Sequence, residues 1–73
     1  MNEKLINKYI NDIDNLGFKE NLILNSKDVA KILGIGVRTL DNWRKENIGP
    51  ITKKVGKAYL YTKRDVAEFL AKE

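Results

Sequence analysis

The sequence predicts a mainly α-helical domain that carries a small β-hairpin. Three observations indicate this fold class. Apolar residues recur at helical spacing in several segments, a glycine-containing corner separates the two middle segments, and strand-like alternation follows Gly49-Pro50. The 73 residues, taken as a single domain over 1–73, are close to the lower limit for folding around one core.

The first segment, residues 1–17, predicts an amphipathic N-terminal helix of about three to four turns. Gly17 follows the last periodic residue, Leu16, as a C-cap glycine would. Two roles suit the apolar stripe from Leu5 to Leu16: it completes the core, or it forms a dimer seam. We favour the core, because so short a chain has little other apolar surface.

Residues 26–46 predict two short helices joined by a tight corner. Ser26 is a suitable N-cap, and Asp28 lies in the first turn, where the helix dipole favours a negative charge. Gly34 permits the left-handed conformation that a sharp corner needs. The side chains expected on the buried faces are those of Val29, Ala30, Ile32, Leu33, Val37, Leu40 and Trp43.

Strand-like segments flank these helices. Leu22-Ile23-Leu24 fits either a brief strand or a packed connector. Residues 51–62 predict a hairpin, because apolar and basic residues alternate on either side of Gly56-Lys57. Tyr59 and Tyr61 share one strand face, so we expect at least one of them to pack inward.

A closing helix is predicted over residues 63–72. Thr62 is suited to cap it, with Asp65 in place for a short-armed capping box. Its apolar face would consist of Val66, Phe69 and Leu70.

The net charge of +4 is unevenly distributed along the chain. Residues 1–25 carry a net charge of −1, residues 26–64 carry +7, and residues 65–73 carry −2. This concentration favours a polyanionic partner, although scattered surface lysines are an adequate alternative interpretation.

The composition excludes several classes of site. The chain has no cysteine and no histidine, which excludes thiolate nucleophiles, zinc fingers and serine–histidine triads. Gly34-Ile35-Gly36 is not a dinucleotide fingerprint, because Thr39 replaces the third glycine and a helix precedes the loop. No apolar run reaches the length of a membrane span, and the N-terminus is no signal peptide. We expect a cytoplasmic protein that is not an enzyme and uses no cofactor or metal.

The middle of the chain resembles a known family. Residues 26–50, SKDVAKILGIGVRTLDNWRKENIGP, and the continuation VGKAYLYTKRDVAEFL resemble the MerR-like and excisionase-like winged helix-turn-helix family. The resemblance covers about residues 24–71 and implies a winged helix-turn-helix, here with an extra N-terminal helix. Gly36 stands where that family usually has a serine or threonine cap, so this helix start is expected to be weaker by a few tenths of a kcal/mol.

The resemblance also implies binding of double-stranded DNA. Arg38 and Asn42 lie four apart on one outward helix face, and such side chains can read guanine and adenine in the major groove. Thr39 and Lys45 flank this pair, and hairpin lysines could contact the backbone or minor groove. Alternatively, these residues form solvated faces, with Arg44 paired to Asp41. The predicted DNA-binding residues are Lys27, Arg38, Thr39, Asn42, Arg44, Lys45, Lys53, Lys54 and Lys57.

Several biological roles fit such a module. In its small size the chain resembles an excisionase, a protein of phages and mobile elements that directs recombination. A small transcription regulator, or a DNA-binding segment of a replication initiator or terminase, is the alternative. A protein-interaction module that uses the N-terminal helix is an alternative from another class. The expected partners are double-stranded DNA, a recombinase or other DNA-bound protein, and further copies of this chain on DNA.

Overall fold

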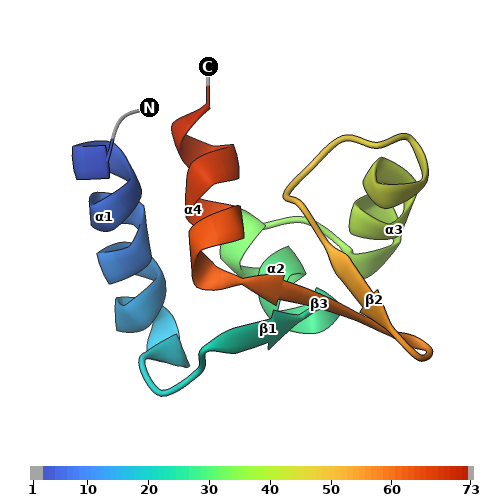
Figure 1. Ribbon diagram of the computed structural model, residues 1–73, viewed down its shortest axis with the longest axis horizontal. Helices are drawn as coiled ribbons and strands as arrows, with labels where there is room; N and C mark the ends of the chain where they lie inside the picture. Colours follow the sequence, from blue (N-terminus) through green and yellow to red (C-terminus); the bar gives the residue numbers. More distant parts are fainter. Residues whose placement is uncertain (1–2, 73) are drawn as a thin grey trace.

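The computed structural model describes residues 3–72, which form helices and a small antiparallel sheet (Figure 1). This order confirms the predicted fold, a winged helix-turn-helix with an extra N-terminal helix. The predicted boundaries at residues 1 and 73 lie outside the described residues. Along the chain the elements are α1 (Glu3–Ile13), η1 (Asp14–Phe18), β1 (Ile23–Asn25), α2 (Ser26–Leu33), α3 (Val37–Lys45), β2 (Lys53–Val55), β3 (Ala58–Thr62) and α4 (Lys63–Ala71).

Helix α1 packs alongside α4 and completes the core, as predicted (Figure 1). Ile6 and Ile13 are fully buried. The α-helix passes into a π-helical turn, Asp14–Phe18, and Gly17 kinks this turn with a φ of 102° instead of capping the helix as predicted. The expectation that Leu16 belongs to the buried stripe is wrong: its side chain is 52% exposed, and Phe18 is buried instead. The wider turn changes the helical phase, which the regular spacing assumed in the prediction does not anticipate.

The start of α2 corrects the predicted cap. Asn25, not Ser26, is the N-cap, because Asn25 is extended whereas Ser26 is already helical. Asn25 Oδ1 accepts a hydrogen bond from the Asp28 amide at 2.8 Å, and the Asn25 amide donates to Asp28 Oδ2 at 3.2 Å. This reciprocal capping box fixes the helix start. Gly34, with a φ of 70°, ends α2 at the predicted corner.

The sheet contains one strand more than the predicted hairpin. Strands β2 and β3 form the hairpin, with the predicted turn at Gly56-Lys57, and β1 pairs antiparallel with the other edge of β3. Of the predicted segment 22–24, Ile23 and Leu24 therefore belong to a strand, while Leu22 precedes it. Leu24 lies opposite Tyr61, and both side chains are buried. The prediction that one tyrosine of β3 packs inward is confirmed.

The core draws side chains from every layer of the fold, and its buried members are Ile13, Phe18, Leu24, Val29, Ala30, Leu40, Tyr61 and Val66. Val37 was expected among them, but it is 39% exposed, because the first residue of α3 lies beside the open corner. Trp43 is half-buried and packs against this core, as predicted. Its ring centroid lies 5.9 Å from that of Phe69 in α4. This contact ties the second helix of the motif to the closing helix.

Helix α4 begins with the predicted capping box. The Asp65 amide donates to Thr62 Oγ1 at 3.0 Å, and the Thr62 amide donates to Asp65 Oδ2 at 3.4 Å. Because Thr62 also ends β3, this cap makes the change from strand to helix abrupt. Within residues 3–72, no helix is both long and apolar enough to cross a membrane.

Candidate nucleic-acid interface

The outward face of α3 carries the predicted base-reading residues. Arg38 and Asn42 are both exposed, one helical turn apart. Thr39 and Lys45, which flank them, are exposed as well. The opposite face is anchored by Leu40, which is fully buried. Helix α3 is therefore held against the core with its polar side chains available to a ligand.

The N-terminus of α3 has the predicted weak cap. Gly36 is the N-cap and makes no side-chain hydrogen bond to the helix. The helix instead receives its support from packing against α2 and from the half-buried Trp43. A short helix without a side-chain cap thus depends on tertiary contacts.

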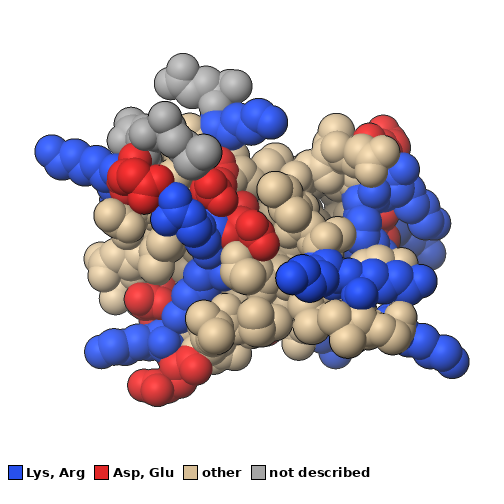
Figure 2. Space-filling model, in the orientation of Figure 1, with Lys and Arg blue, Asp and Glu red and all other residues tan. Residues whose placement is uncertain are grey.

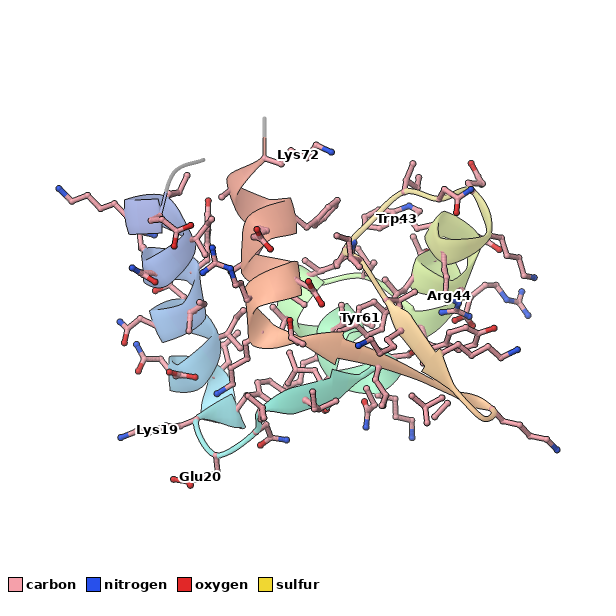
Figure 3. All side chains as sticks on the ribbon, in the orientation of Figure 1. Lys19, Glu20, Trp43, Arg44, Tyr61 and Lys72 are labelled. Carbon is pink, nitrogen blue, oxygen red and sulfur yellow. The ribbon has the colours of Figure 1, made fainter. Side chains whose placement is uncertain are left out.

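Arg44 differs from the other predicted contact residues, because its side chain is only 16% exposed. Its Nη2 lies 2.8 Å from Asp41 Oδ1, which is the intrahelical pair that the sequence offered as the alternative role. Its Cζ lies 3.6 Å from the ring centroid of Tyr59 on β3. Figure 3 shows Arg44 on α3, on the side of the molecule where the β2–β3 hairpin lies. The structure therefore places Arg44 between the helix and the sheet.

Arg44 remains protonated in this position. Burial lowers the pKa of the guanidinium, but Tyr61 and Asp41 together outweigh this effect and raise that pKa above its ordinary value. Arg44 Nη1 and the Tyr61 hydroxyl are nevertheless both buried without a hydrogen bond of good geometry to any described residue. Arg44 is thus a permanent cation held by a carboxylate and an aromatic ring.

The wing presents further cations. Lys53 and Lys54 on β2, and Lys57 in the turn, are all exposed. Figure 1 shows the β2–β3 hairpin extending away from the α1–α4 pair, on the side of the molecule where α3 lies. Lys54 Nζ lies 5.7 Å from the Tyr59 ring centroid, so its stem follows the hairpin surface.

Two lysines of α2 complete the exposed cations of this region. Lys27 and Lys31 are exposed, and Lys31 Nζ lies 5.9 Å from the Phe18 ring centroid. We call the following residues of this region the unpaired cations, because they are exposed and form no ion pair with any described residue: Lys27, Lys31, Arg38, Lys45, Lys53, Lys54 and Lys57. Elsewhere in residues 3–72, Lys4, Lys19 and Lys72 are also exposed without an ion pair.

Two other cations of the basic middle section form ion pairs on another side of the molecule. Lys63 Nζ lies 2.6 Å from Asp14 Oδ1, and Arg64 Nη2 lies 2.6 Å from Glu3 Oε2. Both pairs join α4 to the N-terminal segment. Figure 2 shows mainly blue side chains over α3 and the hairpin, whereas blue and red side chains are mixed over α1 and α4. The cations of residues 26–64 therefore include two groups: Lys63 and Arg64 form ion pairs with the N-terminal segment, and the unpaired cations lie exposed on the surface.

The remaining surface offers other chemistry. A groove of about 780 Å³ lies between the 47–51 loop and α4, with Ile48, Pro50, Ile51 and Phe69 among its lining residues. Asp65 and Glu68 add carboxylates to this lining. Residues 3–72 contain no group of three or more acidic, cysteine or histidine side chains placed to hold a metal ion.

Sequence reasoning missed one member of this region. The Asp41–Arg44 pair follows from its i, i+3 spacing, but Tyr59 belongs to a different element, and no local pattern links it to Arg44. The other predicted residues occupy exposed positions on α2, α3 and the wing.

Comparison with known proteins agrees with this architecture. No curated protein and no solved structure matches the chain. A family model described as a helix-turn-helix domain matches residues 23–73, which is most of the chain. The matched part begins in β1 and includes α2, α3, the wing and α4, while α1 precedes it. The chain belongs to the helix-turn-helix domain family.

Proposed function

We propose that this protein binds double-stranded DNA in a sequence-specific manner, with α3 in the major groove and the wing against the adjacent backbone or minor groove. The supporting observation is the division of the cations. Lys63 and Arg64, which join α4 to the N-terminal segment, are paired with carboxylates, whereas the seven unpaired cations defined above lie together on α2, α3 and the wing. Lysines and arginines that have no protein partner can neutralise phosphates and release counterions.

The side chains divide into two tasks. Arg38 can donate two hydrogen bonds to guanine O6 and N7. Asn42 can donate one hydrogen bond to adenine N7 and accept one from the adenine N6 amino group, so these two residues read base edges. Thr39 and Lys45 flank them and contact phosphate or a thymine methyl group. The lysines that contact the DNA backbone are Lys27 and Lys31 from α2 and Lys53, Lys54 and Lys57 from the wing.

The biological role that we propose is that of an excisionase, which directs recombination of a phage or mobile element. This role rests on the resemblance of residues 24–71 to excisionase-like modules. Its partners would be a recombinase and further copies of the chain on neighbouring DNA sites. A small transcription regulator, or a DNA-binding segment of an initiator or terminase, is the alternative. In each case the protein acts by binding and not by catalysis.

Selection from a random duplex library, followed by affinity measurements between 50 and 200 mM salt, tests the proposed DNA binding. We expect an enriched sequence, and an affinity for it that falls steeply as salt rises. The slope of log K against log salt should be about −0.9 for each phosphate neutralised. The absence of an enriched sequence, or a flat salt response, would overturn the proposal.

Footprinting on DNA that flanks the gene separates the biological roles. Protection of repeated sites beside a recombination junction supports the excisionase role. Protection confined to a promoter supports regulation instead.

A further inference from the structure

The contact between Arg44 and Tyr59 joins two elements that otherwise meet sparsely. Helix α3 packs along α2, and among the described residues the strands approach it at few points. Arg44 comes from the last turn of α3, and Tyr59 from β3. Their separation of 3.6 Å, from Cζ to ring centroid, is that of a guanidinium stacked on an aromatic face.

The position of Tyr59 in the sheet gives this contact its importance. Strand β1 pairs with residues 60–62 of β3, so Tyr59 is the first residue beyond the three-stranded part. From Tyr59 outward, the wing consists only of β2 and β3. A two-stranded hairpin is marginally stable without further packing. Arg44 therefore supports the wing at its base, where the third strand ends.

The same ring also contacts a cation of the wing. Lys54 lies directly opposite Tyr59 in the β2–β3 pairing, so their side chains share one face of the sheet. Lys54 Nζ is 5.7 Å from the ring centroid. Tyr59 thus contacts Arg44 from α3 and Lys54 from the neighbouring strand β2. Asp41 holds the guanidinium from its own helix at 2.8 Å.

We propose that Arg44 and Tyr59 form a joint that sets the angle between α3 and the wing. The inference rests on the proposed function, because its consequence is that helix and wing reach one DNA duplex in a single orientation. Arg44 is then a positioning residue and not a phosphate contact. Its low exposure and its ion pair with Asp41 both favour this role over direct contact.

Three variants separate positioning from charge: Arg44→Lys, Arg44→Met and the exposed neighbour Lys45→Met as the matched control. Lysine keeps the charge but cannot stack as a planar guanidinium does. We expect both Arg44 variants to lose about tenfold in affinity for the selected duplex while the salt slope stays unchanged. Lys45→Met should instead make the slope shallower by about 0.9. Wild-type affinity in Arg44→Lys, together with a shallower slope in Arg44→Met, would overturn the inference.

Tyr59→Leu tests the joint from its other side and leaves the charge of Arg44 in place. It should reproduce the affinity loss of Arg44→Met, and the double variant should be no weaker than either single variant. Additive losses would show that the two residues act separately and would overturn the joint. Thermal unfolding of each variant identifies any that fail to fold, and if Arg44→Met is among them, Tyr59→Leu serves for every measurement.

A measurement without DNA keeps the two proposals distinguishable. Residual dipolar couplings of backbone amides report the orientation of residues 53–60 relative to α3. Tyr59→Leu and Arg44→Met should change this orientation or average the couplings, while the core amides keep their values. Unchanged couplings in both variants would overturn the joint even if the protein binds DNA. A wild-type protein that binds no duplex would overturn the proposed function alone.

Discussion

The two sides of this molecule treat their cations differently. Between α1 and α4, Lys63 and Arg64 each lie 2.6 Å from a carboxylate oxygen, and these pairs join segments far apart in the chain. On α2, α3 and the wing, the unpaired cations have no ion-pair partner among residues 3–72. One set of charges supports the fold, and the other is free to meet a ligand. Arg44 lies between the two cases, since it is paired but belongs to α3.

The largest effect is expected from Trp43→Ala, which removes the support beneath the unpaired side. Trp43 links α3 to Phe69 of α4, and its ring closely approaches Gly49. We expect the free energy of unfolding to fall by about 3 kcal/mol, a large part of the stability of so small a domain. Urea denaturation measures this loss, with the more exposed Val37→Ala as the control. A stable Trp43→Ala that has lost only DNA affinity would make Trp43 a DNA contact.

Arg38→Ala should have the next largest effect, confined to binding. Loss of a bidentate base contact costs about 2 kcal/mol, or about 30-fold in affinity for the selected duplex. Affinity for unrelated duplexes should fall much less, because they retain the phosphate contacts. Anisotropy titrations with both duplexes measure the ratio. Equal losses for the two duplexes would assign Arg38 to the backbone.

A matched pair of lysine variants tests the comparison between the two sides directly. Lys63 is 14% exposed and also donates to the Lys19 carbonyl at 3.0 Å, so Lys63→Met should lower the free energy of unfolding by about 1 kcal/mol. Its DNA affinity and salt slope should remain those of the wild type. Lys57→Met should keep the stability and make the salt slope shallower by about 0.9. If Lys63→Met instead changed the salt slope and Lys57→Met lowered the stability, the distinction between paired and unpaired cations would be wrong.

The smallest effect concerns pH and the paired side. The hydrogen bond from Arg64 lowers the pKa of Glu3 below its ordinary value of 4.5. A carboxyl group whose pKa is lowered by folding stabilises the fold at pH values above its ordinary pKa. That stabilisation is lost as the pH falls through the pKa of the folded state. Denaturation midpoints below pH 4.5 should therefore decline slightly more in the wild type than in Glu3→Gln. Parallel declines would show that the pair adds nothing to stability.

Local patterns in the sequence predicted most of the fold. The capping box at Thr62, the corner at Gly34 and the hairpin turn at Gly56-Lys57 each depend on residues only a few positions apart. The predictions were wrong where a nearby residue could fill the same structural role as the predicted one. Asn25 replaced the adjacent Ser26 as the N-cap, and a π-helical turn exchanged Leu16 for Phe18 in the core.

The candidate interface was predicted in part. The spacing of α3 correctly assigned Arg38 and Asn42 to an exposed face and Leu40 to the core. Arg44, however, is polar like these neighbours, and the sequence allowed it either to contact DNA or to pair with Asp41. Only the approach of β3 places Tyr59 against the guanidinium and covers it.

Patterns in the sequence were enough to predict the order of the elements, their helical and strand periods, and the positive excess of the middle section. These properties depend on near neighbours or on composition, so they can be read before folding. The tertiary fold sets which cations form ion pairs with residues far away in the chain. Asp14 and Lys63 are 49 positions apart, and only the packing of α1 against α4 brings them together. An ion pair requires proximity in space, and for residues so distant in the chain only the fold provides it.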